Sequence, residues 1–134
     1  MTGANPYVYE GTVERVVDGD TAFLRLTKKF VLLVDFGFHI LDTVSLDKTA
    51  IIDCRLAGIN APELSSHDPK VKAAAHRASN ELERLLQLGP LTVTTSKADK
   101  YGRWLAAITA RSPSGPVNVN QAMLDGGFAV PYAG

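Results

Sequence analysis

Runs of β-branched and aromatic residues that alternate with polar ones dominate this sequence, and they constrain its fold more than any other feature. A period of two places successive side chains on opposite faces of a strand. Ile52, Cys54 and Leu56 therefore share one face, and Arg55 is expected to point away from the core. The same reasoning predicts strands over residues 7–17, 21–26, 30–36, 51–57, 91–96 and 104–110.

One long stretch has a helical pattern instead. Asp68 can cap its start, Pro69 suits the first helical position, and Gly89 follows its end. Apolar residues that repeat at helical spacing and are expected to face inward are Val71, Ala75, Ala78, Leu82 and Leu85.

A second, shorter helix is predicted after Asn118, with Gly126 at its end. Its inward residues would be Val119, Ala122 and Met123. Several strands followed by a packed helix indicate an α+β fold. With 134 residues, we expect a single domain spanning residues 1–134 that buries a core without disulfides.

Charge and cysteine content narrow the classes of function. The 14 Lys and Arg balance the 14 Asp and Glu, so attraction to nucleic acid must come from a local patch. Cys54 is the only cysteine, which excludes an internal disulfide and a zinc site built from thiols. The sequence has no secretory signal pattern and no apolar run of membrane-spanning length, so a cytoplasmic location without a membrane partner is predicted.

Three separated segments carry the chemistry: Val17-Asp18-Gly19-Asp20-Thr21, residues 55–63 (RLAGINAPE) and Asp99-Lys100-Tyr101-Gly102-Arg103. They combine carboxylates with arginines. Carboxylates can hold a hard cation and activate water, while guanidinium groups bind phosphate oxygens. The leading hypothesis is hydrolysis of a phosphodiester.

Each segment also has a simpler interpretation when taken alone. Asp-Gly is a strong hairpin signal, so Asp18 and Asp20 would then merely flank a turn. Glu63 would be a solvent-facing charge, and Arg103 a surface partner of Asp99. Trp104, among apolar neighbours, is expected in the core rather than against a base.

In order, identity and approximate spacing, the three segments resemble those of the thermonuclease family, also called staphylococcal nuclease-like. The resemblance runs from about residue 13 to about residue 132 and implies a five-stranded OB-type β-barrel with flanking helices. An insertion at about residues 28–50 separates the first two motifs, and the sequence does not decide whether it extends the barrel or forms a protein interface.

The resemblance also implies roles for individual residues. Asp20, Asn60 and the carbonyl of Ala61 would hold Ca²⁺. Glu63 would be the general base, and Arg55 and Arg103 would bind the phosphate. The substrate would be DNA, with RNA as a second class, cleaved by water to leave 3′-phosphate ends.

Two positions depart from the family pattern. Asn60 stands where an aspartate is common, and Ala61 stands where a threonine is common. Ala61 keeps the backbone carbonyl, whereas Asn60 replaces a charged ligand by a neutral amide oxygen and so weakens the attraction for a divalent cation.

Substrate contacts are predicted for Lys100 and Tyr101, beside the third motif, and for Tyr132 near the C-terminus. Two other functions stay open: a noncatalytic nucleic-acid-binding module that has lost part of its metal site, and a protein-interaction domain built around the insertion. No obligate protein partner is evident from the sequence.

Overall fold

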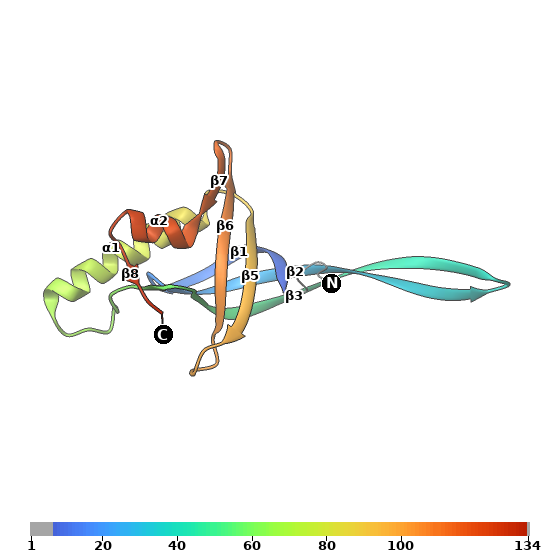
Figure 1. The fold of residues 1–134 in the computed structure, drawn as a ribbon, viewed down its shortest axis with the longest axis horizontal. Helices are drawn as coiled ribbons and strands as arrows, with labels where there is room; N and C mark the ends of the chain where they lie inside the picture. Colours follow the sequence, from blue (N-terminus) through green and yellow to red (C-terminus); the bar gives the residue numbers. More distant parts are fainter. Residues whose placement is uncertain (1–6, 134) are drawn as a thin grey trace.

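Five strands close into a barrel in the computed structural model, which describes residues 7–133 (Figure 1). Their order around the ring is β3 (Ile40–Leu56), β2 (Thr21–Gly37), β1 (Val8–Asp18), β5 (Leu91–Ala98) and β6 (Trp104–Ser112). Neighbours are antiparallel, except that β3 and β6 pair in parallel and close the ring. The predicted α+β architecture with a five-stranded OB-type barrel is confirmed.

Three short strands and two helices complete the described fold around the barrel. The strand β7 (Gly115–Asn118) extends the sheet beyond β6, and β4 (Ile59–Asn60) pairs with β8 (Val130–Pro131). The helices are α1 (Pro69–Leu86) and α2 (Val119–Asp125), which lie on the same side of the barrel (Figure 1). The sequence did not predict β4, β7 or β8, because two to four residues are too few to show a period.

Both helices begin as the capping residues predict. The Asp68 carboxylate accepts the backbone N–H of Lys70, and Asn118 accepts that of Gln121. These bonds satisfy donors that the first turn of a helix leaves without partners. Val71 was expected to face inward but is exposed, because the first turn of α1 extends past the barrel wall (Figure 1).

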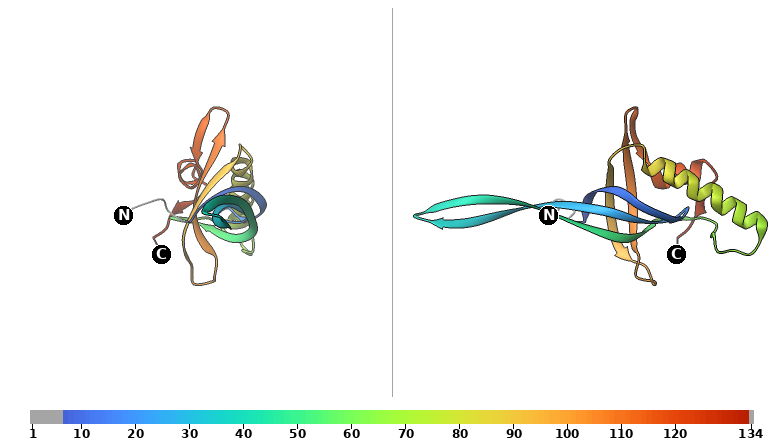
Figure 2. Two further views of the ribbon diagram at one scale, coloured as in Figure 1. Left: turned by 90° about the vertical axis from the view of Figure 1, so that its right-hand side faces the viewer. Right: turned by 180° about the vertical axis from the view of Figure 1, so that it is seen from behind.

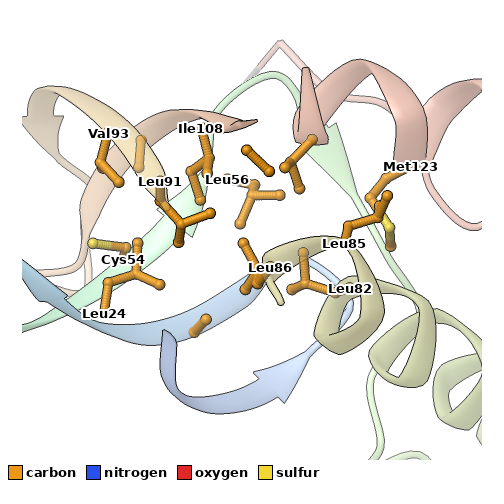
Figure 3. Packing of buried hydrophobic residues seen from close by; sticks show 14 of the residues in the cluster. Leu24, Cys54, Leu56, Leu82, Leu85, Leu86, Leu91, Val93, Ile108 and Met123 are labelled. Atoms are coloured by element: carbon orange, nitrogen blue, oxygen red, sulfur yellow. The ribbon is translucent and has the colours of Figure 1, made fainter. Parts of the chain in front are cut away.

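The core lies between the barrel interior and α1 (Figure 3). Alternate residues of β2 and β3, among them Leu24, Cys54 and Leu56, point inward and are almost fully buried, as the period of two predicts. Leu82 and Leu86 of α1 close the open end of the barrel over them. Each such leucine contributes about 1.5–3 kcal/mol by leaving water.

Residues 28–50, which were predicted to be an insertion, lengthen β2 and β3 into one hairpin that reaches far beyond the barrel (Figures 1 and 2). The predicted break between residues 26 and 30 is absent, and β3 begins well before residue 51. Phe38 and His39 form the turn with φ of 57° and 63°. Trp104 is 40% exposed near the base of this hairpin, so its predicted place in the core is wrong.

Candidate active site

A polar pocket of about 490 Å³ lies where the β1–β2 turn, the end of β3 and the β5–β6 turn meet. The three sequence motifs are far apart in the chain, and the fold brings all of them to this pocket. Its charged walls come from Asp18, Asp20, Arg55, Glu63, Lys97, Asp99, Lys100 and Arg103.

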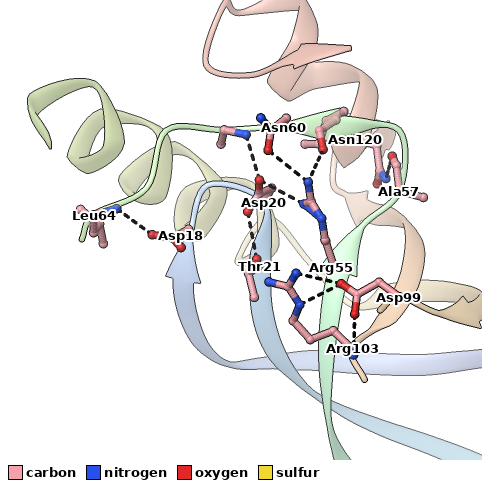
Figure 4. A network of polar contacts seen from close by, with 12 residues as sticks. Asp18, Asp20, Thr21, Arg55, Ala57, Asn60, Leu64, Asp99, Arg103 and Asn120 are labelled. Carbon is pink, nitrogen blue, oxygen red and sulfur yellow. Dashed lines mark hydrogen bonds and ion pairs between the residues drawn. The ribbon is translucent and has the colours of Figure 1, made fainter. Parts of the chain in front are cut away.

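Asp20 and Arg55 form the centre of the pocket (Figure 4). An Arg55 Nη1 to Asp20 Oδ2 distance of 3.1 Å marks an ion pair, and both side chains are about nine-tenths buried. The same Oδ2 accepts the backbone N–H of Ala61 at 2.9 Å, and Oδ1 accepts the Thr21 hydroxyl. Because Arg55 lies directly opposite Thr21 in the β2–β3 pairing, the sheet register fixes this arrangement.

Arg55 also reaches Asn60. Its Nη2 donates to Asn60 Oδ1 at 3.1 Å and to the carbonyl of Ile59 at 3.3 Å. The guanidinium thus bridges Asp20 and Asn60, the two side chains predicted to hold a cation. A positive group between them compensates the buried carboxylate, which would otherwise be costly to desolvate.

Tyr132 forms one wall beside this bridge. Its ring centroid lies 5.1 Å from the Arg55 guanidinium carbon, and its backbone N–H donates to the carbonyl of Gly58. Gly58 has φ of 80°, a conformation that turns the chain out of β3 and costs glycine little. The C-terminal segment is thereby attached to the second motif.

Gly19 sets the position of the two aspartates for a reason that the sequence did not reveal. A Cβ atom at this position would lie 2.6 Å from Cβ of Ala78 and 3.0 Å from Cβ of Ala61. The turn therefore packs directly against α1, and only hydrogen fits there. The hairpin signal explains why a turn occurs, whereas the close approach of the helix explains why this glycine is needed.

Asp18 lies at the end of β1 and accepts the backbone N–H of Leu64 at 2.9 Å. Burial raises the pKa of its carboxyl, and the charges of Asp20 and Glu63 add to this effect against the Leu64 hydrogen bond. Glu63 is exposed on the loop before α1 and lines the pocket. The hydrogen bond to Leu64, next to Glu63, holds that loop against the first motif.

Arg103 is fixed by Asp99, as the simpler interpretation of the third motif predicted. Its Nη2 and Nε lie 2.8 and 2.9 Å from Asp99 Oδ2, while Asp99 Oδ1 accepts the Arg103 backbone N–H. Desolvation acts to raise the pKa of Asp99, but these bonds and one from the Tyr101 N–H hold it below its usual value. The pair still faces the pocket, so a structural role does not exclude a role with substrate.

Lys100 and Tyr101 lie on the exposed turn between β5 and β6, where Gly102 has φ of 82°. The Tyr101 ring is 72% exposed, and the Arg103 guanidinium carbon and Lys100 Nζ each lie 5.3 Å from its centroid. An exposed ring flanked by two cations suits a base with its phosphate.

The pocket gathers all but one of the residues predicted for the site. The exception is Ala61, whose side chain is buried below the lining and whose N–H contacts Asp20. Within residues 7–133, no three His, Cys, Asp or Glu side chains cluster as metal ligands do. Two of the three predicted ligands, an amide and a backbone carbonyl, lie outside those residue types.

Asn120 is a supporting residue that sequence reasoning missed. From α2, its Nδ2 donates to the carbonyls of Ala57 and Ala106, and its Oδ1 accepts the N–H of Ile108. It therefore joins the residue after β3 to β6 just beside the pocket. No motif marks it, because its partners, Ala57 directly after β3 and two residues of β6, are distant in the sequence.

The fold and the pocket define the class as an OB-type barrel, a fold that binds oligonucleotides or oligosaccharides, with carboxylates and arginines gathered in a pocket between its strand ends. The family described as staphylococcal nuclease homologue matches residues 53–133, and the chain belongs to this family. The predicted thermonuclease resemblance is thereby confirmed.

A relative in Bacillus subtilis (strain 168), Endonuclease YhcR, is 31% identical over 133 residues. The match covers 92% of this chain but 9% of the relative, so the chain corresponds to a small part of that protein. Neither helix of residues 7–133 combines the length and apolarity needed to cross a membrane.

Proposed function

We propose that this domain is a calcium-dependent nuclease that hydrolyses phosphodiester bonds of DNA, with RNA as a second substrate class, and leaves 3′-phosphate ends. The observation that carries the proposal is the bridge of Arg55 between Asp20 and Asn60, in a pocket that also contains Glu63 and Arg103. Membership of the nuclease family and the similarity to an endonuclease support the reaction class.

The oxygen atoms that line the pocket are of the type that hard divalent cations bind. Among the described residues that line the pocket, the metal-binding groups are carboxylate and amide oxygens, without imidazole or thiolate. Asp20 and Asn60 would hold the cation, with the Ala61 carbonyl as a third ligand. A bound Ca²⁺ would polarise the phosphate and a nearby water.

The protein's own groups divide the remaining work. Arg55 binds a phosphate oxygen of the substrate. The phosphate is an anion, so it can replace Asn60 and Asp20 as the hydrogen-bonding partner of the guanidinium. Arg103, held from behind by Asp99, binds the second oxygen and stabilises the charge that develops during attack. Glu63 is exposed, with one long hydrogen bond from the Ser65 hydroxyl at 3.5 Å, and accepts a proton from the attacking water.

Lys100, Tyr101 and Tyr132 bind the flanking nucleotides. The exposed rings of Tyr101 and Tyr132 provide surfaces on which bases stack, and Lys100 contributes local positive charge in a chain of zero net charge. Nucleic acid is therefore the partner, and binding weakens as salt concentration rises.

The test incubates purified protein with single-stranded and duplex DNA in calcium or in a chelator. Glu63→Gln is compared with Glu83→Gln, an exposed glutamate on α1, and Arg103→Lys with Arg77→Lys on the same helix. We expect calcium-dependent cleavage that falls at least about 100-fold in the two pocket variants and less than about twofold in the controls.

Calcium affinity has its own readout in the midpoint of thermal unfolding, which rises with the concentration of a ligand bound to the native state. Asn60→Asp should strengthen binding by about tenfold, because it restores a negative ligand. Salt-sensitive DNA binding without cleavage would instead identify the noncatalytic binding module, for which the neutral Asn60 is the specific argument. Equal cleavage by Glu63→Gln would reject the proposed base.

A further inference from the structure

The part of the β2–β3 hairpin beyond the barrel is an arm, defined here as residues 28–48, that displays large apolar side chains. Phe36 and Phe38 near its tip are 69% and 87% exposed. A stable domain rarely leaves so many apolar groups in water, and contiguous patches of this kind mark interaction surfaces. The proposed function uses none of these residues.

The strand register divides the arm into two unlike faces. The pairs Phe30 with Leu46 and Leu32 with Val44 lie on one side, called the inner face here, with Val34 beyond them. These five side chains are 43–51% exposed. On the outer face the apolar residues are 61–68% exposed, and each lies opposite a polar residue on the neighbouring strand. These pairs are Val31 with Ser45, Leu33 with Thr43 and Leu41 with Asp35. The inner face is therefore the more sheltered and the more apolar.

The inner face continues into an apolar pocket of about 370 Å³ at the base of the arm. Phe30 belongs to both, so the pocket and the face form one surface. The other aromatic and aliphatic residues that line the pocket are Tyr7, Tyr9, Leu26, Ala50, Ile52 and Trp104. This explains why Trp104 is 40% exposed: it lines a surface and not the core.

Charge along the inner face changes sign from base to tip. Lys48 lies at the base, opposite Lys28, and Asp42 lies opposite Val34 near the tip. The Asp42 carboxylate accepts the N–H of Thr43, and within residues 7–133 neither Asp42 nor Lys48 forms an ion pair. A surface with a cation at one end and an anion at the other is complementary to itself when turned end over end.

We propose that two copies of this chain associate through their arms, with the inner faces packed together antiparallel about a two-fold axis. The tip of each arm covers the base pocket of its partner, and each Asp42 faces the partner's Lys48. The contact is isologous, so one residue pair occurs twice and the assembly closes as a dimer.

The available area suits such a dimer. Five half-exposed side chains of this size leave about 400 Å² of apolar surface on each inner face, within the range of about 300–600 Å² for the largest patch on a typical monomer, which is often functional. If about 65% of the interface is apolar, as in homodimers, the two copies bury about 1,200 Å² together. That is enough for a specific interface of modest affinity.

The first test measures the mass of the full chain by sedimentation equilibrium from about 1 to 200 μM, the range expected for a modest interface. Leu32→Asp, on the inner face, should raise the dimer dissociation constant at least about 100-fold, because it buries a charge. Leu33→Asp, its neighbour on the outer face, should change it less than about threefold. Both residues lie outside the barrel core, and circular dichroism checks that both variants fold.

A charge exchange tests the antiparallel arrangement itself. Asp42→Lys alone places two lysines together at each end, and Lys48→Glu alone places two acids together. Each variant should therefore dimerise at least about tenfold more weakly than the natural chain. An equal mixture should recover dimers, because every contact between unlike chains then joins opposite charges.

The proposal is wrong if the natural chain is monomeric throughout this range. It is also wrong if Leu32→Asp leaves the dimer intact, if the mixture fails to recover it, or if open-ended oligomers form through the strand edges. If the chain is monomeric in solution and binds phosphatidylcholine vesicles, the partner of the inner face is a lipid surface and not a second copy.

Discussion

Adding one methyl group at Gly19 should disturb both stability and the site. A Cβ at this position would lie 2.6 Å from Cβ of Ala78, although carbon atoms normally approach to about 3.5–4.0 Å. An overlap of roughly 1 Å with a buried helix cannot be relieved by a rotamer change. Gly19→Ala should therefore destabilise the fold by about 2–3 kcal/mol, the upper part of the usual range of about 1–3 kcal/mol for overpacking.

A double-mutant cycle isolates this clash. Ala78→Gly removes the methyl group that Gly19→Ala meets, but it costs about 1 kcal/mol in helix propensity. The double variant should thus be more stable than the sum of the two changes predicts, by about 1–2 kcal/mol. Recovery is partial, since the added Cβ would still lie 3.0 Å from Cβ of Ala61 and 3.2 Å from the backbone of α1.

Urea unfolding measures these free energies, with Ala75→Gly as the control on the same helix. Ala75 is buried like Ala78 and loses the same propensity, yet it is not among the nearest neighbours of Gly19. Coupling of Gly19→Ala to Ala75→Gly should be near zero. A cost of Gly19→Ala below about 0.5 kcal/mol, or equal coupling to both helix positions, would refute the packing argument.

Three further predictions concern single groups. The pKa of Asp18 is raised in the folded state, so the ionised carboxylate present at pH 7 opposes folding. Asp18→Asn removes this charge and should therefore raise the melting temperature at pH 7. The gain should vanish near pH 3, where Asp18 is protonated in both states, and a loss of stability at pH 7 would contradict this sign. Burial raises the pKa of Cys54 to about 12 in the folded state, so above the pKa of the unfolded chain only the unfolded state loses the thiol proton, and the stability that Cys54 contributes is lost. The difference in unfolding free energy between wild type and Cys54→Ala should therefore narrow by about 1.4 kcal/mol from pH 8 to pH 10. A constant difference would count against this argument. Asn120→Ala should cost about 2–4 kcal/mol in urea unfolding, because it leaves the Ala57 and Ala106 carbonyls without this donor, whereas the exposed Gln121→Ala should cost under about 0.5 kcal/mol.

Local signals in the sequence predicted most of the fold. The alternation around Cys54 placed its side chain in the core, and the caps at Asp68 and Asn118 gave both helix starts. The length of β2 and β3 was not predictable in this way. Residues 30–34 are continuously apolar, and a period of two cannot be recognised where both faces carry apolar side chains.

The residues that line the candidate pocket were predictable from the sequence, but their mutual geometry was not. The three motifs identified the groups that line the pocket, including Arg55, Glu63 and Arg103. The sequence could not show that Arg55 bridges Asp20 and Asn60, because that contact depends on the β2–β3 register and the turn at Gly58. Trp104 was assigned to the core from its apolar neighbours, but its position is decided by the arm beside it.

The parallel pairing of β3 with β6 has a consequence for the order of folding. Cys54 pairs with Trp104 across this seam, so the seam can form only after a long loop has closed, whereas the β2–β3 hairpin needs contacts near in sequence. Arg55 belongs to one side of the seam, and Arg103 directly precedes the other. A chain with a finished hairpin and an open seam would have its secondary structure largely in place but its two arginines apart. Recovery of activity during refolding should therefore report the closing of the barrel and lag behind the appearance of its strands.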